Sequence, residues 1–166
     1  SIGSPGTARK ALTVGATSKD DEIADFSSRG PVVWEGGSMI KPDVVAPGVD
    51  ICAAQWEDAW EDSQCFDNEH TAISGTSMAT PHVAGLAALA RQAYPDLSAE
   101  EIKSIIKITS KDLGYHPDVQ GTGRVDASNV MNSKISVLGD LNTGRLGIGV
   151  VGSVKTLKIK NLCDGE

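Results

Sequence analysis

One short segment of the sequence combines the residue types and the spacing that nucleophilic catalysis needs. Residues 75–85 read Gly-Thr-Ser-Met-Ala-Thr-Pro-His-Val-Ala-Gly. Ser77 follows a predicted strand at 70–73 and a glycine, and it opens an Ala-rich predicted helix that runs to about Gln92. At the start of a helix the backbone N–H groups lack partners and the helix dipole is positive, so an oxyanion formed beside Ser77 would be stabilised.

Ser77 also has a purely structural interpretation. Serine is a preferred N-cap residue, and a cap needs no chemistry. Local sequence taken alone favours this interpretation. A nucleophile elbow of the α/β-hydrolase type is disfavoured, because its G-x-S-x-G pattern needs a second glycine where this chain has Ala79.

The eleven residues from 75 to 85 resemble the nucleophile signature of the subtilases, the subtilisin-like serine proteases. Four other segments resemble further parts of the same family in the same order. They are residues 2–6 together with the predicted strand at 11–16, then residues 25–31, residues 41–48 and residues 121–127. Residues 2–6 are similar to the stretch that floors the specificity pocket. The resemblance covers approximately residues 1–131 and favours a catalytic Ser77.

The resemblance implies roles for five residues. Ser77 Oγ would attack the scissile carbonyl and form an acyl-enzyme, and its own backbone N–H would be one oxyanion donor. Thr76 would support the oxyanion hole from beside it. Gly3, Ser4 and Gly75 would contact the substrate. The resemblance therefore implies that this chain is part of a serine endopeptidase that acts on proteins or peptides.

The same resemblance places the catalytic Asp, the catalytic His and the oxyanion Asn well before the serine, in a part that this sequence does not contain. The three histidines present are poor substitutes. His82 lies about 140° round the helix from Ser77, and neither His70 nor His116 has an Asp in a recognisable motif. We expect a fragment that is inactive without the N-terminal part of the same domain. The rival interpretation is a non-catalytic binding or assembly module that retains the fold.

Two short buried strands are predicted at 44–46 and 49–54. Strands combined with helices predict an α/β fold. The resemblance specifies it as part of a subtilisin-like fold, with a mostly parallel sheet flanked by helices and the nucleophile at the N-terminus of a buried central helix. The helix at 77–92 has apolar positions on nearly every side, which also indicates burial. The capping box of Ser98 and Glu101 predicts the start of a second, amphipathic helix.

The hydrophobic pattern of the sequence changes near Ser133. Residues 1–131 form the predicted C-terminal portion of a peptidase domain, and 132–166 form a β-rich tail. Period-two segments at 135–138 and 154–160 predict an antiparallel element there. The tail is interpreted either as the start of a second domain or as an edge hairpin of the first.

Composition excludes several classes of function. A net charge of −7 and a pI of about 4.9 argue against a nucleic-acid partner. No apolar run approaches the ~18 residues that a membrane span needs, and no signal peptide opens the sequence. The resemblance nevertheless implies a secreted or cell-surface protease.

Cysteines and carboxylates leave two questions open. Cys52 and Cys65 bracket one acidic loop. Sequence favours a disulfide between them and a pair of free thiols about equally. The spacing of the three cysteines, including Cys163, fits no zinc site. The loop also carries Trp56 and Trp60. A solvated charged loop is the preferred interpretation, with calcium binding or attraction of basic substrate residues as alternatives. The chemistry needs no cofactor, no metal-binding residue is predicted, and structural calcium stays open.

Overall fold

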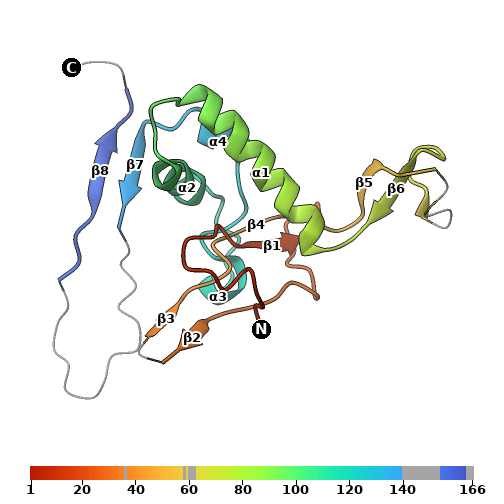
Figure 1. Ribbon diagram of the computed structural model, residues 1–166, viewed down its shortest axis with the longest axis horizontal. Coiled ribbons are helices and arrows are strands. Elements are labelled where there is room, and N and C mark those ends of the chain that lie inside the picture. Colours follow the sequence, from red (N-terminus) through yellow and green to blue (C-terminus); the bar gives the residue numbers. More distant parts are fainter. Residues whose placement is uncertain (36, 58, 60–62, 140–153, 164–166) are drawn as a thin grey trace.

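The computed structural model describes residues 1–166 except 36, 58, 60–62, 140–153 and 164–166. Figure 1 shows a central body of helices and short strands with a hairpin that extends away from it on one side. The elements in chain order are β1 (Val14–Thr17), β2 (Val32–Trp34), β3 (Gly37–Met39), β4 (Val44–Pro47), β5 (Ile51–Ala54), β6 (His70–Ile73), α1 (Thr76–Ala93), α2 (Ala99–Ile108), α3 (Pro117–Gln120), α4 (Ala127–Met131), β7 (Ile135–Leu138) and β8 (Lys158–Asn161).

The centre of the body is a parallel pair of strands. β1 pairs with β4 in the register Val14↔Val44 to Thr17↔Pro47. A parallel bridge to Arg124 lies on the other edge of β4, where the N–H of Val45 donates to the carbonyl of Gly123 at 2.9 Å. Parallel strands are normally buried on both faces, and β4 fits this rule because Val44, Val45 and Ala46 are fully buried and Pro47 is partly buried. The α/β fold with a parallel core is thus confirmed.

The other strand pairs among the described residues are antiparallel and peripheral. They are the hairpins β2–β3 and β5–β6 and the pair β7–β8. The sequence predicted a buried strand over 49–54, but β5 has Cys52, Ala53 and Ala54 exposed. The physical reason is that, among the described residues, β5 pairs with β6 alone and leaves the body with it, so none of the described helices covers either face (Figure 1).

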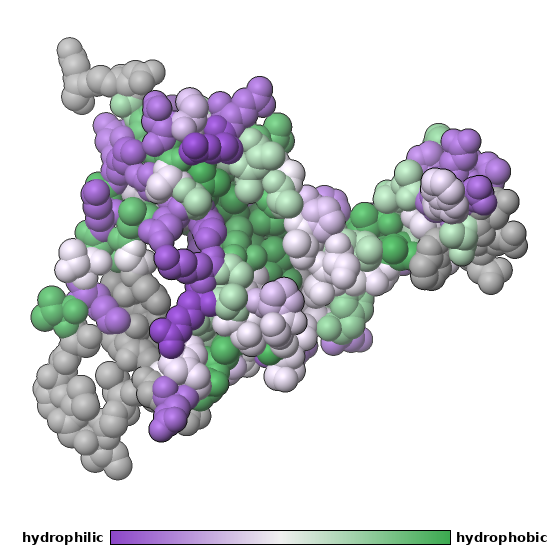
Figure 2. All heavy atoms as spheres, viewed as in Figure 1, coloured by the Kyte–Doolittle hydropathy of each residue, from purple (hydrophilic) through white to green (hydrophobic). Residues whose placement is uncertain are grey.

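Helix α1 is buried along one stripe and not on every side, which corrects the expectation from its composition. The buried residues are Ala79, Val83, Leu86 and Ala90, at the 4-3-4 spacing of one helical face. This face packs on β1 and β4. On the other side of the helix Ala84, Gly85 and Ala88 are exposed, and Leu89 is 50% exposed. Hydrophobic residues are visible along α1 in Figure 2.

Helix α2 packs beside α1 and also carries the tail. Its Ile102, Ile105 and Ile106 are buried in the same hydrophobic core as α1. On another face, Ser104 Oγ donates to the carbonyl of Val137 at 2.5 Å and accepts from the N–H of that residue at 2.8 Å. The predicted antiparallel element therefore exists as β7–β8, and it lies against α2 (Figure 1). The predicted boundary between residues 131 and 132 stays a prediction.

Candidate active site

The start of α1 is fixed to the carboxyl ends of the two parallel strands. The N–H of Gly48, just after β4, donates to the carbonyl of Thr17 at the end of β1, and the N–H of Gly75 donates to the carbonyl of Gly48, both at 2.8 Å. A Cβ on Gly48 would lie 2.7 Å from the Gly75 oxygen and 2.8 Å from the Ala16 Cβ. Only glycine leaves room for this approach, so Gly48 places the helix start at the end of the sheet.

The N-terminus of α1 has no side-chain cap. Gly75 is the N-cap residue, no side chain accepts from the first turn, and that turn contains no acidic residue. Thr76 and Ser77 are the first two helical residues, and their N–H groups have no acceptor within the described part of the chain. Because Gly75 occupies the cap position, the interpretation of Ser77 as an N-cap does not fit this geometry. The positive end of the helix dipole is left uncompensated.

The hydroxyl of Ser77 lies at the surface of the molecule. Ser77 is exposed, and its Oγ makes no hydrogen bond to any residue that the structure describes. The Thr76 carbonyl accepts from Thr80 Oγ1 at 2.8 Å, which supports the first turn from the side. A reacting carbonyl can therefore approach Ser77 Oγ while its oxygen faces the unpaired N–H groups, the arrangement that acyl transfer requires.

A cavity of about 380 Å³ lies beside the helix start. Gly3 and Ser4 line it together with Thr76, so the structure brings three of the predicted site residues to one place. Gly75 and Ser77 are not among the lining residues but flank Thr76 in the chain. Thr80 and Ser28 also line the cavity. They were missed at the sequence level, where Thr80 could have been found because it lies one helical turn after Thr76.

The N-terminal loop that lines the cavity is held by an ion pair whose lysine is buried. Lys41 is 2% exposed, and its Nζ donates to Asp43 Oδ2 at 2.5 Å and to the Ala11 carbonyl at 2.6 Å. Asp43 Oδ2 also accepts from the N–H of Thr13 at 2.7 Å. A buried pair is tolerated when such additional hydrogen bonds complete it. The sequence segment 41–48 was noted for its resemblance, but the burial of Lys41 was not predicted.

None of the three histidines contacts Ser77 within the described structure. His82 Nδ1 lies 2.9 Å from the Met78 carbonyl one turn earlier, and His70 Nδ1 lies 2.6 Å from Asp67 Oδ1. The His116 ring accepts from the N–H of Asp118 at 3.2 Å, at the start of α3. His82 is exposed, and its hydrogen bond stays within α1.

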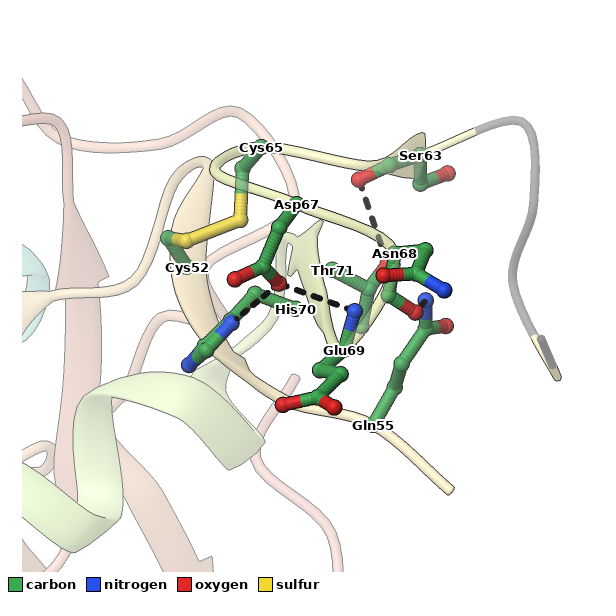
Figure 3. Close-up of a disulfide and its surroundings, with 9 residues drawn as sticks. All are labelled: Cys52, Gln55, Ser63, Cys65, Asp67, Asn68, Glu69, His70 and Thr71. Carbon is green, nitrogen blue, oxygen red and sulfur yellow. Dashed lines mark hydrogen bonds and ion pairs between the residues drawn. A yellow bond between two sulfur atoms is a disulfide. The ribbon is translucent and has the colours of Figure 1, made fainter. Parts of the chain in front are cut away.

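Cys52 and Cys65 form a disulfide with a Cα–Cα distance of 6.0 Å, and Cys163 is free. The bond lies in the β5–β6 hairpin, where Asp67 is also hydrogen-bonded (Figure 3). The His70 ring, which bonds to Asp67, holds the pKa of that carboxyl below its usual value. Trp60, Asp58, Glu61 and Asp62 of the acidic loop lie outside the described residues.

Among the residues that the structure describes, no group of three or more His, Cys, Asp or Glu side chains is arranged to hold a metal ion. A structural calcium site thus stays a prediction without a location. No helix in the described ranges is both long enough and apolar enough to cross a membrane.

Comparison with known proteins gives one consistent result. The family model described as "Subtilase family" matches residues 1–127. The serine protease AprX of Bacillus subtilis (strain 168) is 41% identical over 140 residues, which covers 77% of this chain and 31% of AprX. The minor extracellular protease Vpr of the same organism is 39% identical over 125 residues, covering 68% of this chain and 14% of Vpr.

A solved structure agrees in fold. The CspB protease of Clostridium perfringens superimposes with a TM-score of 0.62 at 31% identity, covering 78% of this chain and 28% of CspB. The chain therefore spans about a third or less of the length of each of these relatives. On the match over residues 1–127, the chain belongs to the subtilase family of serine proteases.

Proposed function

We propose that this chain is the nucleophile-bearing part of a subtilisin-type serine endopeptidase. The observation that carries the proposal is an exposed Ser77 as the second residue of a helix that has neither a side-chain cap nor an acidic first turn. The alternative, a non-catalytic module that keeps the fold, does not require that arrangement. Family membership supports the serine protease class.

The proposed chemistry follows from this geometry. Ser77 Oγ loses its proton to a general base and bonds to the carbonyl carbon of the scissile peptide, and the carbonyl oxygen becomes an oxyanion. The N–H of Ser77 donates to that oxyanion, with Thr76 beside it. Collapse of the tetrahedral species expels the amine, which takes up the proton from the base, and leaves an acyl-enzyme that water then hydrolyses. Gly3, Ser4 and Gly75 bind the substrate next to the cavity.

The general base in this proposal comes from polypeptide outside residues 1–166. Each of the three histidines of the sequence is bonded elsewhere, to Met78, Asp67 or Asp118. The catalytic Asp and His and the oxyanion Asn of the family are therefore supplied by the N-terminal part of the same domain. In subtilisin, loss of one member of the triad lowers kcat by up to ~10⁶-fold, so the chain by itself is expected to be nearly inert.

The exposed side of α1 is the proposed contact for that N-terminal part. On this side Ala84, Gly85, Ala88 and Leu89 are exposed, and Leu89 is 50% exposed. Open apolar surface of this kind favours association. We expect the isolated chain to self-associate. Sedimentation velocity tests this, and a compact, stable monomer would contradict it.

The location proposed for the parent protein is outside the cell or on its surface. Disulfides persist in oxidising compartments, and the Cys52–Cys65 bond fits such a compartment. The relative Vpr is named as an extracellular protease. Protein or peptide substrates follow from the family, and structural calcium is proposed only as an accessory.

A fluorophosphonate probe tests the function directly. The chain is treated alone and after reconstitution with the proposed N-terminal part, and the adduct is located by mass spectrometry. Labelling at Ser77 only in the reconstituted protein is the expected result. No labelling in either state would support the non-catalytic module instead.

A further inference from the structure

The hairpin β5–β6 and the described residues of its connecting loop (51–57, 59 and 63–73) form an arm that leaves the body of the molecule. Figure 2 shows the arm as a lobe joined to the rest by a narrow neck. At its base, the Ser74 hydroxyl accepts from the N–H of Asp50 at 2.9 Å and donates to its carboxylate at 3.2 Å. The arm thus ends just before the helix start that carries Ser77.

Several interactions give the arm a defined shape although it has little contact with the body. The pairing runs from Ile51↔Ile73 to Ala54↔His70. The Cys52–Cys65 disulfide joins β5 to the returning chain (Figure 3). Beyond the strands, the N–H of Gln55 donates to the Glu69 carbonyl at 2.8 Å.

The turn that precedes β6 is ordered by a carboxylate. Asp67 Oδ1 accepts from the N–H of Glu69 at 2.8 Å and lies 2.6 Å from His70 Nδ1 (Figure 3). The Phe66 ring meets the His70 ring edge to face, with centroids 5.7 Å apart. The surface of the arm is therefore preorganised, which lowers the entropy cost of binding to it.

Two large aromatic side chains on this preorganised arm are exposed. Trp56 is 80% exposed and Phe66 is 83% exposed. Aromatic residues are enriched in the energetically dominant positions of interfaces. Leaving two of them in water on a projecting, cross-linked hairpin costs hydrophobic free energy, which a partner that covers them would recover.

The charge of the surroundings selects the partner. The sequence from 42 to 90 contains no Lys or Arg, and the described acidic residues of the arm are Glu57, Asp67 and Glu69. Exposed aromatic faces attract cations, and carboxylates on the same arm add to that attraction. The same surface would repel an anionic partner, and it would leave its carboxylates unpaired against a purely apolar partner.

We propose that the arm is an exosite that binds a Lys- or Arg-rich segment of the protein substrate, at a distance from the bond cleaved at Ser77. The proposal rests on the proposed proteolytic function, because a protein substrate would present one segment to Ser77 for cleavage and a second, basic segment to the arm. It deepens that function by naming a substrate class. Trp56 and Phe66 would cover the alkyl stems and cations, while Glu57 and Glu69 pair with the charges.

Binding is tested on the reconstituted protein carrying Ser77→Ala, so that no cleavage occurs. The probe is a fluorescein-labelled peptide of alternating lysine and arginine with small residues, and its matched control carries glutamine at every basic position. Fluorescence anisotropy should show binding of the basic peptide that weakens as salt rises. Trp56→Ala should weaken it by roughly threefold to fivefold, the range expected for one exposed cation–π contact.

Matched variants separate the arm from general effects. Glu57→Gln with Glu69→Gln should weaken binding, whereas Glu22→Gln with Glu100→Gln removes the same charge elsewhere and should not. Tyr115→Ala, an exposed aromatic outside the arm, should also leave binding unchanged. Mass spectrometry under non-reducing conditions verifies the Cys52–Cys65 bond in each variant. Equal weakening by both charge pairs would overturn the exosite.

Other outcomes are equally decisive. Labelling of Ser77 by the fluorophosphonate probe without binding of the basic peptide would overturn the exosite and leave the proposed function standing. Binding of the basic peptide without any labelling of Ser77 would overturn the assignment of the arm as a protease exosite, because the proposed catalytic function would then have failed. Self-association that Glu57→Gln with Glu69→Gln abolishes, without peptide binding, would identify a second copy as the occupant. In the active protein, Trp56→Ala should raise KM for substrates with a basic segment and leave kcat unchanged.

Discussion

The two long helices begin in opposite ways although a serine lies at the start of each. In α2, Ser98 is the N-cap: its Oγ accepts from the N–H of Glu101, and the Glu101 carboxylate accepts from the N–H of Ser98 at 2.7 Å and from its hydroxyl at 2.8 Å. In α1, Gly75 is the N-cap, no side chain caps the turn, and Ser77 is exposed without a partner in the described structure.

This difference shows what each helix start contributes. A capping box satisfies the free N–H groups and stabilises the helix, but it also occupies the positions where an external anion could bind. An uncapped start costs stability and leaves the donors available. In this chain α2 therefore has the arrangement of a structural helix, and α1 has the arrangement that an oxyanion site needs.

The largest expected effect is on chemistry at α1. Ser77→Ala in the reconstituted protein should abolish fluorophosphonate labelling and lower peptide hydrolysis by up to ~10⁶-fold, the size known for loss of the nucleophile in subtilisin. Because Ser77 makes no hydrogen bond within the described residues, the free energy of unfolding should change by less than about 0.5 kcal/mol. Labelling that survives in the variant would remove Ser77 from the mechanism.

The attachment of α1 to the sheet comes next in size. Gly48→Ala places a Cβ 2.7 Å from the Gly75 carbonyl oxygen. Overpacking of this kind costs about 1–3 kcal/mol and should shift the helix start as well. Urea denaturation should report the lower stability, and the labelling rate at Ser77 should fall. Gly85→Ala is the control for the urea denaturation of the isolated chain, because a Cβ there meets nothing within 4 Å.

At α2 the expected effects reverse. Ser98→Ala should lower the free energy of unfolding by about 1 kcal/mol, the usual value of an N-cap. Labelling at Ser77 should be unchanged. Urea denaturation and the fluorophosphonate assay on the same preparation check both parts, and a loss of labelling would mean that the two helix starts are not independent.

The smallest effect is a pH dependence that α2 alone should show. Hydrogen bonds from the Ser98 N–H and hydroxyl, and then from Lys160, lower the pKa of Glu101 from 4.5 to about 2. A lowered pKa in the folded state means that the stabilisation is complete above about pH 4.5 and is lost as the pH falls toward 2. Denaturation at pH 6 and pH 3 should therefore show a steeper loss for the natural chain than for Glu101→Gln. Equal losses would contradict the shift.

Much of this architecture was predictable from local sequence. Residues 70–73, the helix that follows them, and the Ser98–Glu101 capping box were all expected where the structure has them, because each depends on residues close together in the chain. The parallel core and the family were predictable from motif order. Burial was less predictable: α1 was expected to be covered all round, and β5 was expected to be inside.

Sequence by itself determined which residue is the candidate nucleophile and that it opens a helix, because cap chemistry, glycine positions and the motif are local. Only the tertiary structure decided that Gly48 seats this helix on the ends of β1 and β4, that Lys41 and Asp43 pair inside, and that Gly3 and Ser4 meet Thr76 at one cavity. These contacts join residues tens of positions apart. They depend on packing between elements, which no local pattern encodes.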